Sequence, residues 1–155
     1  MANTIADRLA ERGIDLPQAA APAANYVAWV IAGDMLYISG QLPLEKGHLA
    51  YTGHLGHDHK VLAGQAAAEL CAINVLAQAK SALDGDLERI VQLVRITGYV
   101  ASTPDFVEQH LVVNGASDLF AAVLGDKGKH ARAAVGTASL PLNAAVEVDA
   151  IFQIA

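Results

Sequence analysis

Cysteine is nearly missing from this sequence of 155 residues, which contains only Cys71. A single thiol excludes an intrachain disulfide framework, and it fits a reducing compartment such as the cytoplasm. Charged residues are also few, at 17%, whereas apolar residues make up 54% of the chain. That balance excludes a disordered protein. At this length we expect one domain built around one core.

Long apolar runs and excess basic charge are both lacking. No run of about 20 apolar residues, the length of a membrane-spanning helix, is present. Asp7 and Arg8 stand where a secretory signal would need an apolar segment. The 10 Lys and Arg residues are outnumbered by 16 Asp and Glu residues, so the surface repels a phosphate backbone. We expect a cytoplasmic protein with no membrane and no nucleic-acid partner.

Apolar residues exceed what a small globule hides easily, which favours a homo-oligomer with a buried interface. Residues 1–24 are expected to form an N-terminal leader with a short helix over residues 5–12, followed by a proline-containing stretch that is either mobile or draped over the domain. Residues 25–155 are expected to form the single main domain.

The spacing of apolar residues predicts the elements of that domain. The predicted strands cover residues 26–31, 35–39, 90–100, 132–139 and 143–154, and residues 41–60 form a long loop. One helix is predicted over residues 61–83, and a second opens at Thr103-Pro104-Asp105 and ends at Gly125. The order predicts an α+β fold, with two long helices on one face of a sheet. The uncovered face is expected to be buried against copies of the chain.

Histidines gather in the segment Gly53-His54-Leu55-Gly56-His57-Asp58-His59, and histidine and aspartate are common metal ligands. No cysteine ligand, HExxH helix or fixed distal partner accompanies them. The alternative is a solvated loop in which Asp58 caps the following helix. We favour the loop and expect no metal. Cys71, inside the first long helix, is expected to be an inert buried thiol.

Arg132 and Glu147 each stand inside an otherwise apolar strand. If Leu140-Pro141-Leu142-Asn143 connects the two strands, they pair antiparallel and bring the charges to neighbouring positions. Two interpretations remain open. The residues form an ion pair at the sheet edge, or the guanidinium grips a substrate carboxylate while the glutamate positions water or acts as a general base.

Two sets of motifs resemble the Rid/YjgF imine deaminase family. Near the C-terminus these are Ala131-Arg132-Ala133-Ala134-Val135-Gly136, Ser139-Leu140-Pro141 and Val146-Glu147-Val148. Near the N-terminus they are Tyr26-Val27, Gly33 and Ile38-Ser39-Gly40-Gln41-Leu42-Pro43. The resemblance runs from about residue 26 to the C-terminus. An outlying branch is indicated by Thr97-Gly98-Tyr99-Val100, Asn114-Gly115-Ala116-Ser117-Asp118-Leu119 and Gly128-Lys129-His130-Ala131-Arg132.

The resemblance implies a chorismate-mutase-like α+β fold, assembled as a homotrimer with a ligand cleft at each subunit interface. It implies that Arg132 binds the carboxylate of a 2-imino or enamino acid and that Glu147 positions the hydrolytic water. The products would be a 2-oxo acid and ammonia, with no metal or cofactor. Further substrate-binding positions implied in this way are Tyr26, Gly40, Asn114 and Ala134.

The chain departs from the family pattern in several places, among them two positions close to Arg132. Ala134 stands where many members carry cysteine, and Gly136 replaces an acidic residue. The alternative function is therefore a non-catalytic trimer that senses small carboxylates, such as 2-oxo acids, through Arg132. Glu147 distinguishes the two functions, because binding needs only the arginine. Ribonuclease activity ranks lowest, because the chain is acidic and has no basic aromatic stripe.

Overall fold

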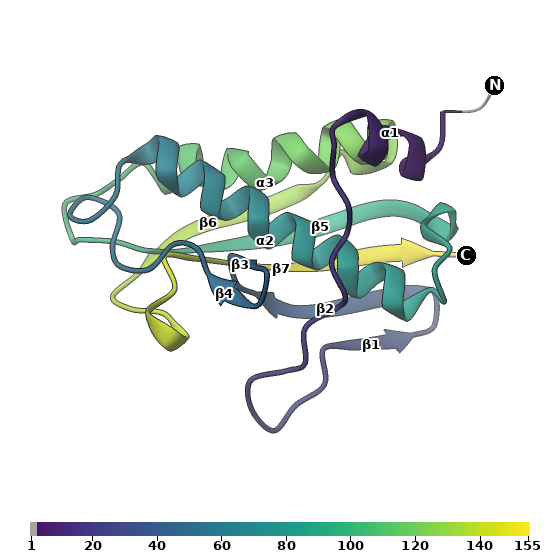
Figure 1. The fold of residues 1–155 in the computed structure, drawn as a ribbon, viewed down its shortest axis with the longest axis horizontal. Coiled ribbons are helices and arrows are strands. Elements are labelled where there is room, and N and C mark those ends of the chain that lie inside the picture. The colour runs from purple at the N-terminus through teal and green to yellow at the C-terminus, as the bar shows by residue number, and fades with distance from the viewer. Residues whose placement is uncertain (1–2) are drawn as a thin grey trace.

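Residues 3–155, which this computed structural model describes, form a five-stranded sheet covered on one face by two long helices (Figure 1). The spatial order of its strands is β1 (Trp29–Ala32), β2 (Met35–Gln41), β7 (Val146–Ile154), β5 (Ile90–Ala101) and β6 (Ala131–Thr137). The helices are α2 (Val61–Ala82) and α3 (Gln109–Leu124), which pack side by side. This arrangement confirms the predicted α+β fold.

Short elements fill the connections. The predicted loop of residues 41–60 contains a small hairpin of β3 (Leu44–Glu45) and β4 (His48–Leu49). Single 3-10 turns are η1 (Leu87–Arg89), η2 (Gly125–Gly128) and η3 (Pro141–Asn143). The first helix of the chain is α1 (Ile5–Glu11), as the leader pattern predicts.

The predicted start of α3 at Thr103-Pro104-Asp105 is wrong, because this tripeptide forms a separate turn. The Thr103 hydroxyl donates to the Asp105 carboxylate at 2.7 Å, and the Phe106 N–H donates to the Thr103 carbonyl at 3.1 Å. These local bonds satisfy the polar groups that would otherwise open a helix. The helix begins only at Gln109.

The predicted pairing of the two charged strands is also wrong. Strand β6 pairs in parallel with β5, and β5 pairs antiparallel with β7, so β5 lies between the strands that carry Arg132 and Glu147. The cause is the connection through α3. A helix that crosses over the sheet returns the chain parallel to the strand it left, as in a βαβ unit.

Alternation along β7 defines the two faces of the sheet. Val146, Val148 and Phe152 are fully buried beneath the helices, whereas Glu147 and Asp149 point to the opposite, uncovered side. We call that side the open face. Its exposed apolar side chains include Val30, Tyr37 and Val135. The helix face is thus fully buried within the chain, whereas the open face leaves apolar side chains exposed.

Helix α2 is long and apolar enough, by length and composition, to cross a membrane, but more than half of its most apolar stretch is buried inside the domain. Cys71, Val75 and Ala79 on it are fully buried. This is the burial of a central core helix. Burial raises the pKa of the Cys71 thiol, as expected for an unreactive cysteine.

The leader is draped over the domain. Helix α1 begins with a capping box between Thr4 and Asp7, and its Ile5 and Leu9 are buried in the same core as the long helices. The Ile5 N–H donates to Glu88 at 2.6 Å. Beyond α1 the chain crosses α2 towards the edge of the sheet at β1 (Figure 1), and the Gln78 amide donates to the Ala20 carbonyl at 2.8 Å.

Replacing Ile5 with Ala removes a fully buried side chain from the junction of leader and core. We expect a loss of about 2–4 kcal/mol in the free energy of unfolding, measured by urea denaturation at a fixed protein concentration. Glu11→Ala, at an exposed position on the same helix, is the matched control and should change little. Equal stability of the two variants would show that the leader unfolds separately from the domain.

Candidate functional site

The guanidinium of Arg132 is fixed by hydrogen bonds to two residues of α3. Its side chain leaves β6 on the helix face, where Nη1 donates to the Ser117 hydroxyl at 3.0 Å and Nη2 donates to the His110 carbonyl at 2.8 Å. Among residues 3–155, no carboxylate forms an ion pair with it. Three of the five N–H donors of the guanidinium therefore stay available, in a plane that two hydrogen bonds fix.

Ser117 is itself fixed by His130. The His130 Nε2 lies 2.9 Å from the Ser117 hydroxyl oxygen, and Nδ1 lies 2.6 Å from the Gly128 carbonyl. A carbonyl only accepts, so Nδ1 carries the hydrogen, and Nε2 accepts from Ser117. Ser117 in turn accepts from Arg132, which only donates. The sequence motifs contain Ser117 and His130 but signal no role for either, because only the packing of η2 under α3 brings them together.

Two further predicted site residues lie beside Arg132. Asn114 follows His110 by one helical turn and precedes Ser117 by three residues, so it shares their side of α3. Ala134 follows Arg132 by two residues and points to the same face of β6. We call Arg132, Asn114 and Ala134 the arginine half-site. It lies at one edge of the sheet, under α3.

Glu147 lies on the open face, next to Gly40. A Cβ at Gly40 would stand 2.7 Å from the Glu147 Oε2 atom, so no larger residue fits while the carboxylate keeps this position. The pairing of β2 with β7 shifts between Ile38 and Gln41, which places a bulge at Ser39 and Gly40. The bulge brings the β2 backbone against the Glu147 side chain.

Tyr26 and Gly40 line one cleft of about 200 Å³. Tyr26 is 48% exposed, so it is accessible there. We call Glu147, Gly40 and Tyr26 the glutamate half-site. The structure thus collects the predicted site residues into two groups of three.

The two half-sites do not meet within one chain. Arg132 pairs with Ile96 of β5, and Glu147 pairs with Tyr99, so the charged residues stand two strands and three positions apart. This corresponds to about 10 Å across the sheet and about 10 Å along it. Their side chains also point to opposite faces. Neither neighbouring positions nor an ion pair between them is found.

A second carboxylate affects Glu147. Burial raises the pKa of Glu147, and the charge of Asp149, two residues further on the same face, raises it further. Asp149 accepts hydrogen bonds from the Tyr99 hydroxyl at 3.2 Å and from the Thr97 N–H at 3.1 Å. Burial, followed by Asp149, also raises the pKa of Tyr99. Glu147 is therefore a half-buried carboxyl suited to exchanging a proton.

Two histidines of the loop over residues 53–59 make hydrogen bonds to backbone carbonyls, one of them in a distant segment. The rings of His54 and His59 lie 2.6 Å from the carbonyls of Ala138 and Thr52. Asp58 accepts from the His54 N–H at 2.8 Å, which closes a turn, whereas Lys60, the N-cap residue of α2, makes no side-chain capping bond. The predicted capping of that helix by Asp58 is wrong. Within residues 3–155, no three His, Cys, Asp or Glu side chains are grouped to hold a metal ion.

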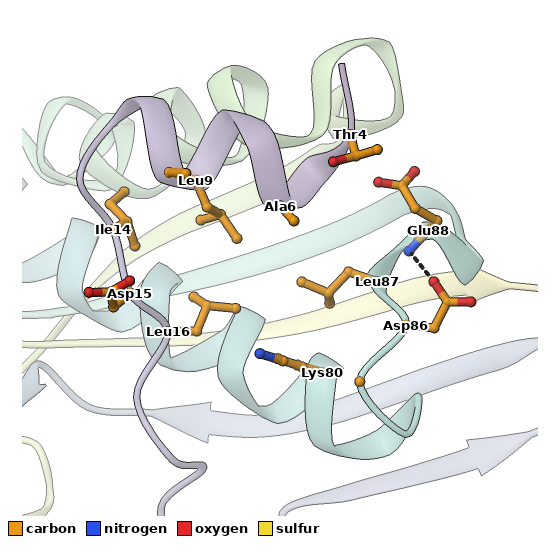
Figure 2. Close-up of a pocket in the computed structure, with 12 residues that line it drawn as sticks. Thr4, Ala6, Leu9, Ile14, Asp15, Leu16, Lys80, Asp86, Leu87 and Glu88 are labelled. Carbon is orange, nitrogen blue, oxygen red and sulfur yellow. Dashed lines mark hydrogen bonds between the residues drawn. The ribbon is translucent and has the colours of Figure 1, made fainter. Parts of the chain in front are cut away.

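A depression of about 400 Å³ lies between the leader and the end of α2 (Figure 2). Leu9, Leu16 and Leu87 project into it, with charged groups around its rim. Two of its carboxylates have backbone partners, since Asp86 accepts from the Glu88 N–H at 3.1 Å and Glu88 accepts from Ile5. No half-site residue lines it. We assign it to the packing of the leader.

Comparison with known proteins places the chain in a family. The profile described as YjgF/chorismate mutase-like, putative endoribonuclease, matches residues 6–153. Protein TCP17 of Trypanosoma cruzi is 50% identical over 151 residues, which cover 97% of this chain and 94% of that protein. The chain therefore belongs to the YjgF family, which confirms the resemblance drawn from its motifs.

Solved structures agree with this assignment. Protein Atu1372 of Agrobacterium tumefaciens, whose function is described as unknown, is 58% identical with a TM-score of 0.92, covering 97% of this chain and 92% of its own. TdcF of E. coli, solved with bound serine, is 22% identical with a TM-score of 0.63, covering 89% of this chain and 94% of its own. The latter shares the fold.

Replacing Asp149 with Asn is expected to lower the pKa of Glu147, because it removes a like charge from the same face. The pKa should stay above the ordinary glutamate value, since burial remains. Titration of the side-chain carboxyl carbons by NMR measures the change. Asp118→Asn, exposed on α3, is the control. An unchanged pKa in Asp149→Asn would show that the two carboxylates do not interact.

Proposed function

We propose that the protein hydrolyses small 2-imino or enamino acids to 2-oxo acids and ammonia, in a cleft between subunits of a homotrimer. The observation that carries the proposal is the pair of half-sites. One offers a fixed guanidinium without a carboxylate partner among the described residues, and the other offers a half-buried carboxyl with a raised pKa. Membership of the YjgF family supports the same chemistry.

The division of the site favours assembly. Arg132 and Glu147 point to opposite faces of one sheet, so one substrate reaches both only if the arginine half-site of one chain meets the glutamate half-site of another. The apolar side chains of the open face supply a surface for that contact. A closed ring with head-to-tail interfaces repeats the same contact at each interface. We propose that the ring is a trimer.

Hydrolysis of an imine requires mainly that the substrate and a water molecule be correctly positioned, because the imine carbon is already electrophilic. The substrate carboxylate accepts hydrogen bonds from the free N–H groups of Arg132. Water adds to the electrophilic imine carbon while Glu147 accepts its proton, and the same proton passes to the nitrogen. Glu147 next takes the hydroxyl proton of the resulting carbinolamine and passes it to the nitrogen, so that the carbon–nitrogen bond breaks, ammonia leaves, and the carbonyl forms. No metal or cofactor enters this mechanism.

The remaining site residues have supporting roles in the proposal. Tyr26 and the backbone at Gly40 form one wall of the cleft, and Asn114 and the backbone at Ala134 form the other. Burial and Asp149 increase the affinity of Glu147 for a proton, which suits a group that must accept and return one. The leader and residues 25–155 are proposed to act as one unit in the cytoplasm, which the buried free thiol of Cys71 fits.

The second candidate is a non-catalytic trimer that binds small carboxylates. TdcF, which shares the fold, was solved with bound serine, and serine carries a carboxylate; this is in keeping with such binding. The arginine half-site alone suffices for such binding. Nucleic acid is not proposed as a partner, because the net charge of -6 opposes it.

Turnover is tested with imines that an amino acid oxidase generates in situ, by following release of 2-oxo acid and ammonia. We expect the wild type to accelerate release, and Arg132→Ala and Glu147→Gln to lose about 100-fold or more in kcat/KM. Arg12→Ala, an exposed arginine of the leader, is the matched control. Sedimentation should show the same oligomer for all four proteins.

Binding of 2-oxo acids, measured by calorimetry, separates the two candidates. Glu147→Gln should retain binding, and Arg132→Ala should lose it. A wild type that binds 2-oxo acids through Arg132 and hydrolyses no imine would favour the sensor over the deaminase. Loss of assembly in Arg132→Ala would make this arginine a structural residue.

Mixing the two inactive variants tests the division of the site. In rings assembled at random from equal amounts of Arg132→Ala and Glu147→Gln chains, about one interface in four combines an intact arginine with an intact glutamate. Activity should return to about a quarter of the wild-type value. Two differently tagged batches of Arg132→Ala, mixed in the same way, are the control. No recovery in proven mixed rings would place both residues in one subunit's site.

A further inference from the structure

We propose that His130 is a positioning residue for carboxylate binding, which sets the orientation of the Arg132 guanidinium through the Ser117 hydroxyl. The proposal rests on the proposed function and adds to it a residue that acts without touching the substrate. The His130 Nε2 atom lies 2.9 Å from the Ser117 hydroxyl oxygen, and that oxygen accepts from the Arg132 Nη1 at 3.0 Å. His130 therefore acts on the guanidinium through the serine.

The imidazole of His130 has one tautomer and one orientation in this fold. Its Nδ1–H donates to the Gly128 carbonyl at 2.6 Å, which leaves Nε2 as the acceptor for Ser117. The ring also packs edge-on against Phe120, a fully buried side chain of α3, with ring centroids 6.2 Å apart. Turning the acceptor away from Ser117 would break both hydrogen bonds.

The turn that supplies the Gly128 carbonyl is fixed against α3. Gly128 is buried, and a Cβ at this position would stand 2.5 Å from the Phe120 carbonyl oxygen, so the close approach of η2 to the helix requires glycine. The Gln92 amide donates to the Lys129 carbonyl, which attaches the following residue to β5. The imidazole therefore has a fixed support formed by η2, α3 and β5.

His130 gives the Ser117 hydroxyl a defined direction. A hydroxyl rotates readily and carries one hydrogen and two lone pairs. When its hydrogen points to Nε2, its oxygen presents a lone pair to Arg132, and hydrogen bonds in series strengthen one another. Without the imidazole, the serine is free to rotate and bond its own helix. Arg132 then keeps one anchor, the His110 carbonyl, and must be ordered when a carboxylate binds.

Removing the imidazole should weaken carboxylate binding. The probe is pyruvate, a small 2-oxo acid, with affinity measured by calorimetry. We expect His130→Ala to raise the Kd about three- to tenfold, because one loosened side chain must be ordered on binding, and Ser117→Ala to raise it by a similar factor. His48→Ala and Ser81→Ala, at exposed positions on β4 and α2, are the matched controls. An unchanged Kd in His130→Ala would overturn the proposal.

Two further variants separate positioning from a general loss of structure. Once the serine is removed, His130 has nothing to position, so Ser117→Ala/His130→Ala should bind pyruvate no more weakly than Ser117→Ala alone. His130→Gln supplies an amide oxygen that accepts from the Ser117 hydroxyl, and it should recover most of the wild-type affinity. Losses that multiply in the double variant, or a glutamine variant as weak as the alanine variant, would contradict the proposal.

The mobility of the guanidinium distinguishes failure of this proposal from failure of the proposed function. NMR relaxation of the Arg132 Nε–H measures that mobility without any ligand, and Arg132→Ala is the reference for lost pyruvate binding. If Arg132→Ala abolishes binding while His130→Ala neither weakens binding nor loosens the guanidinium, the positioning role fails alone. If the wild type binds no pyruvate but His130→Ala loosens the guanidinium, the positioning of Arg132 stands and the proposed function fails.

Discussion

The position of β5 between β6 and β7 is the constraint on which the rest of the site depends. The α3 crossover makes β6 parallel to β5 and leaves β7 on the other side. Arg132 then faces α3, and Glu147 faces away from both helices. Because the two charges do not neutralise each other, each stays free for an external partner.

Each half-site is organised within its own chain before any assembly. Arg132 is fixed by Ser117 and His110, and Ser117 by His130, so the guanidinium does not have to be ordered when a carboxylate arrives. Glu147 is restricted in a different way, because the β2 backbone at the Gly40 bulge lies against its half-buried side chain. Preorganised groups of this kind stabilise developing charge without reorganising during the reaction.

Much of the fold followed from local patterns, because apolar spacing and turn residues are local signals. The helix over 61–82 and the strands at 90–101 and 146–154 fall within a few residues of their predicted positions. Strand partners are not a local property. The pairing of Arg132 with Glu147 was wrong because the sequence between them shows a connection but not the strand lying between. Ser117 and His130 were not predicted for the same reason, since the sequence does not show whether a polar side chain faces solvent or another polar group of the fold.

The close contact between Gly40 and Glu147 restricts which residues fit at position 40. Every other amino acid adds at least a Cβ, and that first atom would collide with the Glu147 carboxylate. A larger residue at position 40 therefore requires the Glu147 side chain to move away, a shorter residue at position 147, or a shift of β2 relative to β7. Two positions 107 residues apart in the chain are thus coupled through one close contact. Because Gly40 has only a hydrogen atom where other residues have a Cβ, the Glu147 carboxylate can lie directly against the backbone of β2.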